Sequence, residues 1–355
     1  MNTKTVRGRS AAGSVALWLD LQDSVPEGTR LSELSAMGAA GTIAGAGLGP
    51  ETGVAAARQV CDALRPLHDR TGGRRGTVVL TLPPAALPPA PLPPSPVLPA
   101  AAAPDAAELV RGAASLADRV DRINQVVAVP ANDAGVAAME VLLARGLPVH
   151  LATCFSARRY EQAVAAYLSA LTRAHADGRD LAPLASTVAF GLRPLDIRID
   201  GLLDRAGGEE AKALRGTAAL LAARLARRAS TRIFDPRTSP TWETLAAAGA
   251  RPLRLVWTEL GDLAPAAGSQ TDYAAELVDA DTALAVRAES LDTAAGLRPR
   301  PTRSDRGLAA QAGHFEACLR WFGIRTEEVV RELEGEPAAF AAAPPSRALV
   351  AGGVS

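Results

Sequence analysis

The chain alternates between two periods of hydrophobic and polar positions. Short apolar runs rich in Val and Leu recur between longer Ala-rich segments, in which apolar residues repeat at the spacing of one helix face. This alternation is typical of consecutive βα units that build a parallel sheet. The predicted strands are residues 15–20, 41–44, 77–82, 125–129, 148–152, 186–190, 254–257 and 282–286.

The segments between these strands predict helices with recognisable ends. Ser156 and Asn132 are typical N-cap residues, and Gly146 follows the last apolar position of its segment. At this length, the pattern is compatible with one large α/β barrel or with two smaller domains. The predicted helices are residues 51–67, 106–117, 134–144, 157–176, 197–203, 209–229, 240–247, 306–321 and 325–333.

A proline-rich segment follows the third predicted strand. Residues 83–104 contain ten prolines and no charged residue. Because proline lacks a backbone N–H and fixes φ, polyproline II or an irregular loop is expected there. In a barrel, such a loop lies at the carboxyl-end face, where active sites are built. A tolerated low-complexity insertion and a lid or partner-docking loop both stay open.

Composition excludes several functional classes. The formal charge is zero, which gives no electrostatic basis for binding nucleic acid or an anionic membrane. No apolar run reaches the roughly 18 to 20 residues that span a bilayer, and the first residues lack the apolar region of a signal peptide. Cys61, Cys154 and Cys318 include no CxxC pair, so we expect reduced thiols and no metal site. These features predict a soluble cytoplasmic protein.

Five stretches of the chain resemble the transaldolase family of class I aldolases, in matching order and spacing from about Ser14 to about Leu333. They are SVALWLDLQD, NQVVAVPANDAG, VHLATCFSARRYEQAVAAYLSAL, RIDGLLDRAGGEEAKALRGTAALLAARLA and GARPLRLVWTEL. The resemblance implies a single (β/α)8 TIM barrel with its site at the carboxyl ends of the strands. We therefore expect a flexible N-terminus at 1–13, a barrel at 14–335 that includes the loop at 83–104, and a C-terminal tail at 336–355.

The resemblance also implies the chemistry of a Schiff-base lysine on the fourth strand, aided by an Asp on the first strand and a Glu on the third. The Asp is present as Asp20, but the Glu position holds Thr81 and the lysine position holds Ala128. A methyl group cannot form an imine. Two of the 38 basic residues are lysines, Lys4 and Lys212, and neither aligns with the catalytic amine.

Most other ligand positions of the family are also replaced. The family's Thr-Thr-Asn-Pro run after the second strand falls on residues 43–46, which read Ile-Ala-Gly-Ala. Its phosphate-holding Arg falls on Pro194, one place from Arg193, and its phosphate-contacting Ser falls at about Glu259. Its Asn and Thr on the fifth strand and its Ser on the sixth become His150, Ala152 and Ala189.

These replacements predict a small, apolar pocket with a few polar groups. Asp20, His150 and Glu259 are the candidate catalytic residues for proton transfer. The expected wall consists of Thr81, Ala128, Ala152, Ala189, Arg193 and Trp257. A structural role stays open for His150, as a hydrogen-bonded residue of the core, and for Asp20, as a brace of the fold.

Three functions follow as hypotheses. The first is proton-transfer chemistry without a lysine, such as cyclisation, isomerisation or elimination, on an apolar, nonphosphorylated small molecule of specialised metabolism. The second is a noncatalytic binding or scaffold protein, and the third is residual transaldolase or aldolase activity on sugar phosphates. No cofactor or metal is expected. The partner is a small-molecule substrate, with neither nucleic acid nor membrane, and a homodimer is an open option.

Overall fold

The structure is a computed structural model that describes residues 16–22, 43–48, 52–82, 104–261, 272–279, 281–287, 290, 293–294, 297 and 305–335. The expected N-terminal segment 1–13, the tail at 336–355 and residues 83–103 of the proline-rich loop lie outside the described residues.

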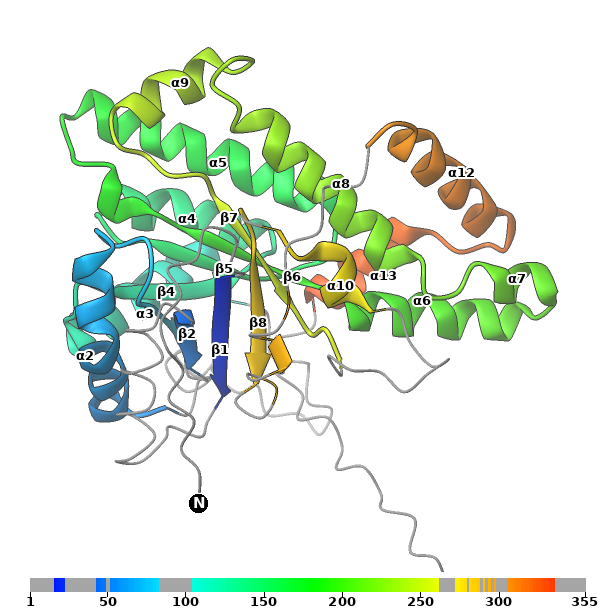
Figure 1. Cartoon of the computed structure of the whole chain (residues 1–355), viewed down its shortest axis with the longest axis horizontal. Coiled ribbons are helices and arrows are strands. Elements are labelled where there is room, and N and C mark those ends of the chain that lie inside the picture. The colour runs from blue at the N-terminus through cyan, green and yellow to red at the C-terminus, as the bar shows by residue number, and fades with distance from the viewer. Residues whose placement is uncertain are drawn as a thin grey trace, which may run out of the picture.

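Eight parallel strands close into one barrel. Neighbours follow chain order, and β8 pairs with β1 through positions such as Leu284 and Leu17. Figure 1 shows helices around the barrel, with β1 and β8 pointing toward the bottom of the view. The prediction of a (β/α)8 barrel is confirmed. The strands are β1 (Ala16–Gln22), β2 (Ile43–Leu48), β3 (Thr77–Thr81), β4 (Gln125–Pro130), β5 (Val149–Cys154), β6 (Thr187–Gly191), β7 (Arg254–Thr258) and β8 (Ala283–Arg287).

Helices form the outer layer of the barrel. Side-chain caps fix several of their starts: Asn132 accepts from Gly135 N, and Ser156 accepts from Arg159 N. The main helices are α2 (Val54–Arg70), α3 (Ala106–Val120), α4 (Asp133–Ala144), α5 (Ala157–Ala176), α6 (Arg193–Ala206), α7 (Glu209–Ala213), α8 (Ala218–Ile233), α9 (Pro240–Ala247), α10 (Tyr273–Leu277), α12 (Leu308–Trp321) and α13 (Thr326–Gly335).

The prediction of a single helix at 209–229 is wrong, because the chain turns between α7 and α8. Gly216 has a φ of 67°, a conformation that ends a helix and favours glycine. Its backbone N–H donates to the carboxylate of Asp200 on α6, at 3.0 Å. Two residues into α8, the N–H of Ala219 donates to the buried carboxylate of Asp196, at 2.8 Å. Contacts from α6 therefore fix this break.

Two hydrophobic clusters divide the core. The smaller one lies in the barrel interior and joins residues of β1, β3, β4, β7 and β8: Ala16, Trp18, Val79, Val126, Ala128, Val256 and Ala283. The larger one lies between the strands and the helices, and contains the alternate strand residues such as Leu17, Val127 and Trp257. The period of two along each strand separates the two sets.

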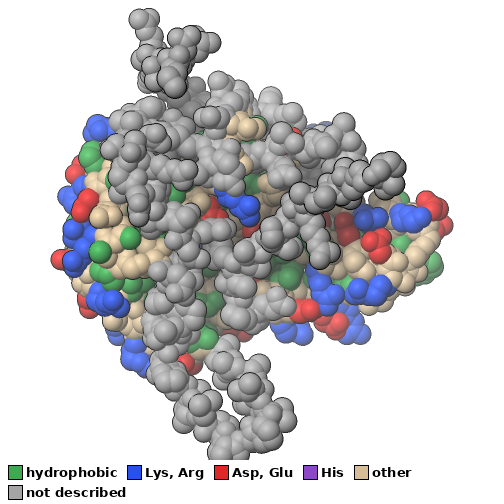
Figure 2. Space-filling view, turned by 90° about the horizontal axis from the view of Figure 1, so that it is seen from below, with side chains coloured by type: hydrophobic (Ala, Val, Ile, Leu, Met, Phe, Trp, Pro, Cys, Tyr) green, Lys and Arg blue, Asp and Glu red, His purple; other side chains and the backbone are tan. Residues whose placement is uncertain are grey.

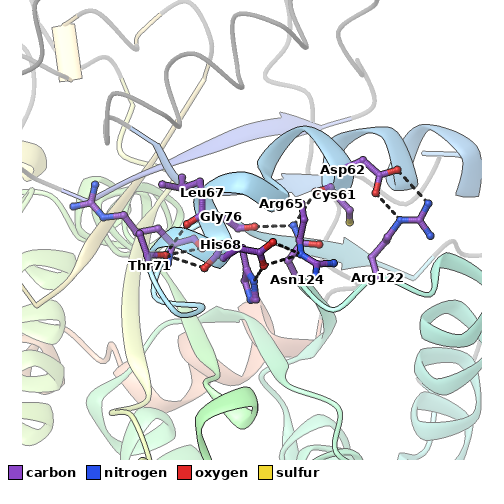
Figure 3. Close-up of polar contacts among 11 residues, drawn as sticks. Cys61, Asp62, Arg65, Leu67, His68, Thr71, Gly76, Arg122 and Asn124 are labelled. Carbon is purple, nitrogen blue, oxygen red and sulfur yellow. Dashed lines mark hydrogen bonds and ion pairs between the residues drawn. The ribbon is translucent and has the colours of Figure 1, made fainter.

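At the amino end of the barrel, polar contacts join α2 to β3 and β4 (Figure 3). The side-chain amide of Asn124, which is buried, donates to the backbone oxygens of Cys61 and Gly76, both at 2.9 Å. Asp62 and Arg122 form an ion pair across the same corner at 2.6 Å. Burial raises the pKa of Cys61 to about 12, so this thiol stays protonated and belongs to the core.

No described helix is long and apolar enough to cross a membrane. Within the described ranges, no group of three or more metal-ligating side chains converges.

Candidate functional site

The carboxyl ends of β1 and β8 point toward the bottom of Figure 1, and Figure 2 views the molecule from that side. Charged side chains of both signs lie around its described rim (Figure 2). Five residues at this end of the barrel form a group that we call the mouth. They are Asp20 on β1, Thr81 on β3, Ala152 on β5, Gly191 on β6 and Glu259 directly after β7. Parallel strands bring these residues to one end of the barrel although they are far apart in sequence.

Ala128 on β4 lies deeper in the barrel interior than the mouth. It pairs in register with Thr81 on one side and His150 on the other, and it belongs to the interior cluster with an exposed fraction of 4%. Its neighbours in that cluster include Trp18 and Val126. Ala189 on β6 is similarly buried. The place that the resemblance assigns to the imine-forming lysine is therefore a closely packed methyl group.

His150 lies in the barrel interior, at the register position of Ala128. Its ring stacks on Trp18 with centroids 5.9 Å apart and an angle of 19° between the planes. Its Nδ1 lies 2.7 Å from the hydroxyl oxygen of Thr187. Burial lowers the pKa of His150 to about 4, so the imidazole is neutral near pH 7. These contacts give His150 a structural role, and its catalytic role remains a prediction.

Glu259 and Asp20 approach one another from strands that are not neighbours. Burial, and after it the negative charge of Asp20, together raise the pKa of Glu259 to about 7. Glu259 is exposed to solvent, although enough protein lies around its carboxyl group to shift its pKa. Near pH 7, Glu259 is therefore present in both its protonated and its ionised form.

Backbone strain directs Glu259 toward the mouth. Its φ is 56°, so the alternation of side chains between the inside and the outside of the barrel, which would place Glu259 on the same side as Trp257, ends here. A Cβ added to Gly191 would lie 3.2 Å from the Glu259 Oε2 and 2.5 Å from a ring carbon of Phe155. Glycine at position 191 thus leaves the space in which the Glu259 carboxylate lies. Strained non-glycine residues of this kind cluster at functional sites.

A second strained residue, Thr153, lies near the mouth as the penultimate residue of β5. Its φ is 63°, which is unusual for a β-branched residue, and the pairing of β5 with β6 shifts register between Leu151 and Cys154. Sequence reasoning missed Thr153 and Gly191. The glycine after the apolar run of β6 was the available signal, whereas nothing in the sequence reveals the φ of Thr153. Burial raises the pKa of Cys154 to about 12, so its thiol is protonated.

The remaining expected wall residues lie in different places. Arg193 is the first residue of α6 and is exposed beside the end of β6. Trp257 is fully buried outside the barrel interior, where its ring packs edge-on against Phe190 with centroids 5.6 Å apart. The structure therefore does not bring Trp257 to the mouth. Arg287, which was not among the expected residues, ends β8 in register with Asp20 and is exposed.

Comparisons with known proteins identify the family. Residues 97–250 match the family model for transaldolase/fructose-6-phosphate aldolase. Transaldolase 1 of Streptomyces avermitilis is 35% identical over 282 residues, which cover 79% of this chain and 69% of that protein. Transaldolase 1 of Streptomyces coelicolor is 34% identical over 79% of this chain and 68% of its own length. The chain belongs to the transaldolase family.

Membership in the transaldolase family corrects two expectations. The prediction of cyclisation, isomerisation or elimination in specialised metabolism is wrong, because the relatives that match 79% of the chain are named transaldolases. The expected nonphosphorylated substrate conflicts with a family whose description names fructose 6-phosphate. Membership indicates an enzyme of the aldolase and transferase type instead of a cyclase.

Proposed function

We propose that this chain binds a phosphorylated ketose at the mouth and catalyses its aldol cleavage or transfer, with Asp20 and Glu259 moving the protons. The observation that carries the proposal is the raised pKa of Glu259, at about 7, beside the carboxyl group of Asp20. A carboxyl group with a pKa near 7 beside a second carboxyl group provides an acid and a base at the same site. The relatives named transaldolase support the aldol reaction and the sugar-phosphate class.

Aldol cleavage needs one proton removed and one supplied. Asp20 accepts the proton of the hydroxyl group on the carbon that becomes the aldehyde. The carbon–carbon bond next to this carbon breaks, and its electron pair forms the double bond of an enediol at the former carbonyl carbon. Protonated Glu259 gives its proton to the former carbonyl oxygen. In transfer, the reverse steps join the enediol to a second aldehyde.

Positive charge for the phosphate is available at the ends of two strands. Arg193 begins α6 after β6, and Arg287 ends β8 next to Asp20. Both side chains are exposed on the carboxyl-end face. Arginine binds phosphate oxygens through paired N–H groups, so these two residues are the proposed phosphate contacts.

The test is turnover and binding of fructose 6-phosphate. We expect calorimetry to detect binding and an aldehyde-trapping assay to detect glyceraldehyde 3-phosphate. Arg193→Gln should raise KM about tenfold, the scale of one lost charged hydrogen bond. The matched control is Arg111→Gln on α3, because Arg111 is exposed and distant from the mouth.

Two outcomes contradict the proposal separately. Binding of fructose 6-phosphate without product formation would remove the proton-transfer role of Asp20 and Glu259. No binding, or equal KM values for Arg193→Gln and the wild type, would remove the assignment of the phosphate contact.

A further inference from the structure

Arginines from three segments converge at the amino end of the barrel, opposite the mouth. Arg254 is the first residue of β7, and it shares the inward face of that strand with Val256. In register it pairs with Thr187, whose hydroxyl contacts the interior residue His150. Arg75 lies in the loop between α2 and β3 and is close enough to Arg254 to lower its pKa.

The loop between α2 and β3 is held in place by its own contacts (Figure 3). The Thr71 hydroxyl oxygen accepts a hydrogen bond from Arg75 N at 3.0 Å. Gly76 has a φ of 76°, and an added Cβ would lie 2.6 Å from the backbone of His68 and of Leu64. Arg75 is therefore presented from a defined turn.

Arg251 connects this loop to the segment before β7. Its guanidinium donates to the backbone oxygen of Gly72, and its own backbone oxygen accepts from the Tyr167 hydroxyl at 2.9 Å. Arg74 lies close enough to lower the pKa of Arg251, after the larger effect of burial. Four arginines thus gather at this end of the barrel, two of them from the same turn.

The charge of Arg254 is incompletely compensated. Its guanidinium makes no hydrogen bond or ion pair with any residue in the described part of the chain, although it is partly buried. Burial and then Arg75 lower its pKa, and Arg251 contributes in the same direction. Asp281 attracts Arg254 from a distance, and Asp180 similarly attracts Arg251. Asp281 and Asp180 both belong to exposed residues, so solvent screens these attractions.

We propose that the amino end of the barrel is an anion site, at which Arg75, Arg251 and Arg254 bind a phosphate group. A half-buried guanidinium without a partner, among other arginines, is stabilised when an anion supplies the missing acceptors. Arginine is weakly hydrated and presents planar N–H groups that match tetrahedral oxyanions. The group is free phosphate or the phosphate of a small metabolite.

Thermal unfolding and calorimetry at constant ionic strength test the site, with inorganic phosphate as the probe. Phosphate should raise the melting temperature of the wild type, of the exposed control Arg111→Gln and of the mouth variant Arg193→Gln. In Arg254→Gln, the Kd for phosphate should rise about tenfold or more, the scale of a charged hydrogen bond. Without phosphate, Arg254→Gln should melt no lower than the wild type, because it removes a desolvated charge from among like charges.

Three results would overturn the site. The first is no stabilisation of the wild type by phosphate. The second is an unchanged phosphate Kd in Arg254→Gln together with a lower melting temperature, which would make Arg254 a packing residue. The third is loss of the phosphate effect in Arg193→Gln but not in Arg254→Gln, which would place the anion at the mouth. Arg75→Gln repeats the test at a loop position outside the barrel interior. Comparing phosphate with fructose 6-phosphate in these variants distinguishes free phosphate from a sugar-bound one.

Discussion

At the residue scale, Glu259 controls the pH behaviour of the mouth. Its pKa of about 7 means that a growing fraction loses the proton as pH rises through neutrality. We expect kcat for fructose 6-phosphate to decline above about pH 7 in the wild type, because the acid of the pair is lost. Glu259→Gln should lower kcat by about 100-fold or more, the usual effect of removing a general acid. A pH–rate profile of both proteins measures this.

The control for this prediction is Glu243→Gln, because Glu243 is an exposed carboxylate on α9. Stability gives an independent readout. The folded-state pKa of Glu259 is raised from its ordinary value of 4.5, so its contribution is complete below pH 4.5 and is lost as pH rises through about 7. Glu259→Gln should therefore narrow the difference in melting temperature between pH 5 and pH 8. Identical profiles in variant and wild type would exclude Glu259 as the acid.

The contribution of His150 to stability depends on pH in the opposite direction. Its pKa is lowered from 6.5 to about 4, because the charged ring would be buried in the barrel interior. The stability that depends on neutral His150 is present above about pH 6.5 and is lost as pH falls through about 4. The loss amounts to roughly 3 to 4 kcal/mol at most, since one pKa unit corresponds to about 1.4 kcal/mol.

His150→Phe tests this linkage because it keeps an aromatic ring against Trp18 and cannot be protonated. We expect the variant to lose less stability than the wild type between pH 6.5 and pH 4 in urea unfolding. The hydrogen bond to Thr187 is lost at every pH and provides a constant offset. A variant with the same acid sensitivity as the wild type would mean that other groups control acid unfolding.

At the element scale, a buried carboxylate joins α6, α8 and α10. Asp196 has an exposed fraction of 4% and accepts from Ala219 N and from the Tyr273 hydroxyl. Burial raises the pKa of Asp196 in spite of both donors. Tyr273→Phe removes one donor from this carboxylate, so we expect a loss of about 1 to 3 kcal/mol in the free energy of unfolding, measured in urea. Unchanged stability would show that α10 docks without this hydrogen bond.

Element boundaries were predictable where the signal is local. Ser156 and Ser239 cap α5 and α9, and both helices begin and end where the sequence predicts. The break between α7 and α8 was missed, because the acceptors that fix it, Asp196 and Asp200, belong to α6. A helical period continues through such a break, and contacts between helices are not visible in it.

The candidate site was predictable to a similar degree. Inward strand positions follow from the period of two, which is why Thr81 and Ala128 lie in register on neighbouring strands. Trp257 was assigned to the wrong face, since one residue decides the side of a strand on which a side chain lies. The approach of Glu259 to Asp20 depends on the positive φ of Glu259, which cannot be predicted from a glutamate in the sequence.

At the scale of the whole molecule, the barrel forms with Ala128 at the position that the resemblance assigns to the Schiff-base lysine. We expect no covalent adduct by mass spectrometry after treatment with fructose 6-phosphate and borohydride. Ala128 has no nitrogen to react, and Lys212 lies on the outer helix α7 in an ion pair with Glu209 at 2.8 Å. An adduct on Lys212 or Lys4 would contradict this. Ala128→Lys should also fail to form an imine efficiently, because position 128 is packed and Thr81 supplies no carboxylate.

The position of Lys212 also allows the chain to be cut by a protease between two strands of the barrel. A protease that cleaves after lysine meets one such bond in the described part of the chain, on an exposed helix between β6 and β7. The cut would leave β1 to β6 on one fragment and β7 and β8 on the other. Two uninterrupted ladders, β6 with β7 and β8 with β1, would still join the fragments. The closed sheet thus provides a two-piece version of the protein, in which the partners Asp20 and Glu259 reside on separate polypeptides and can be exchanged independently.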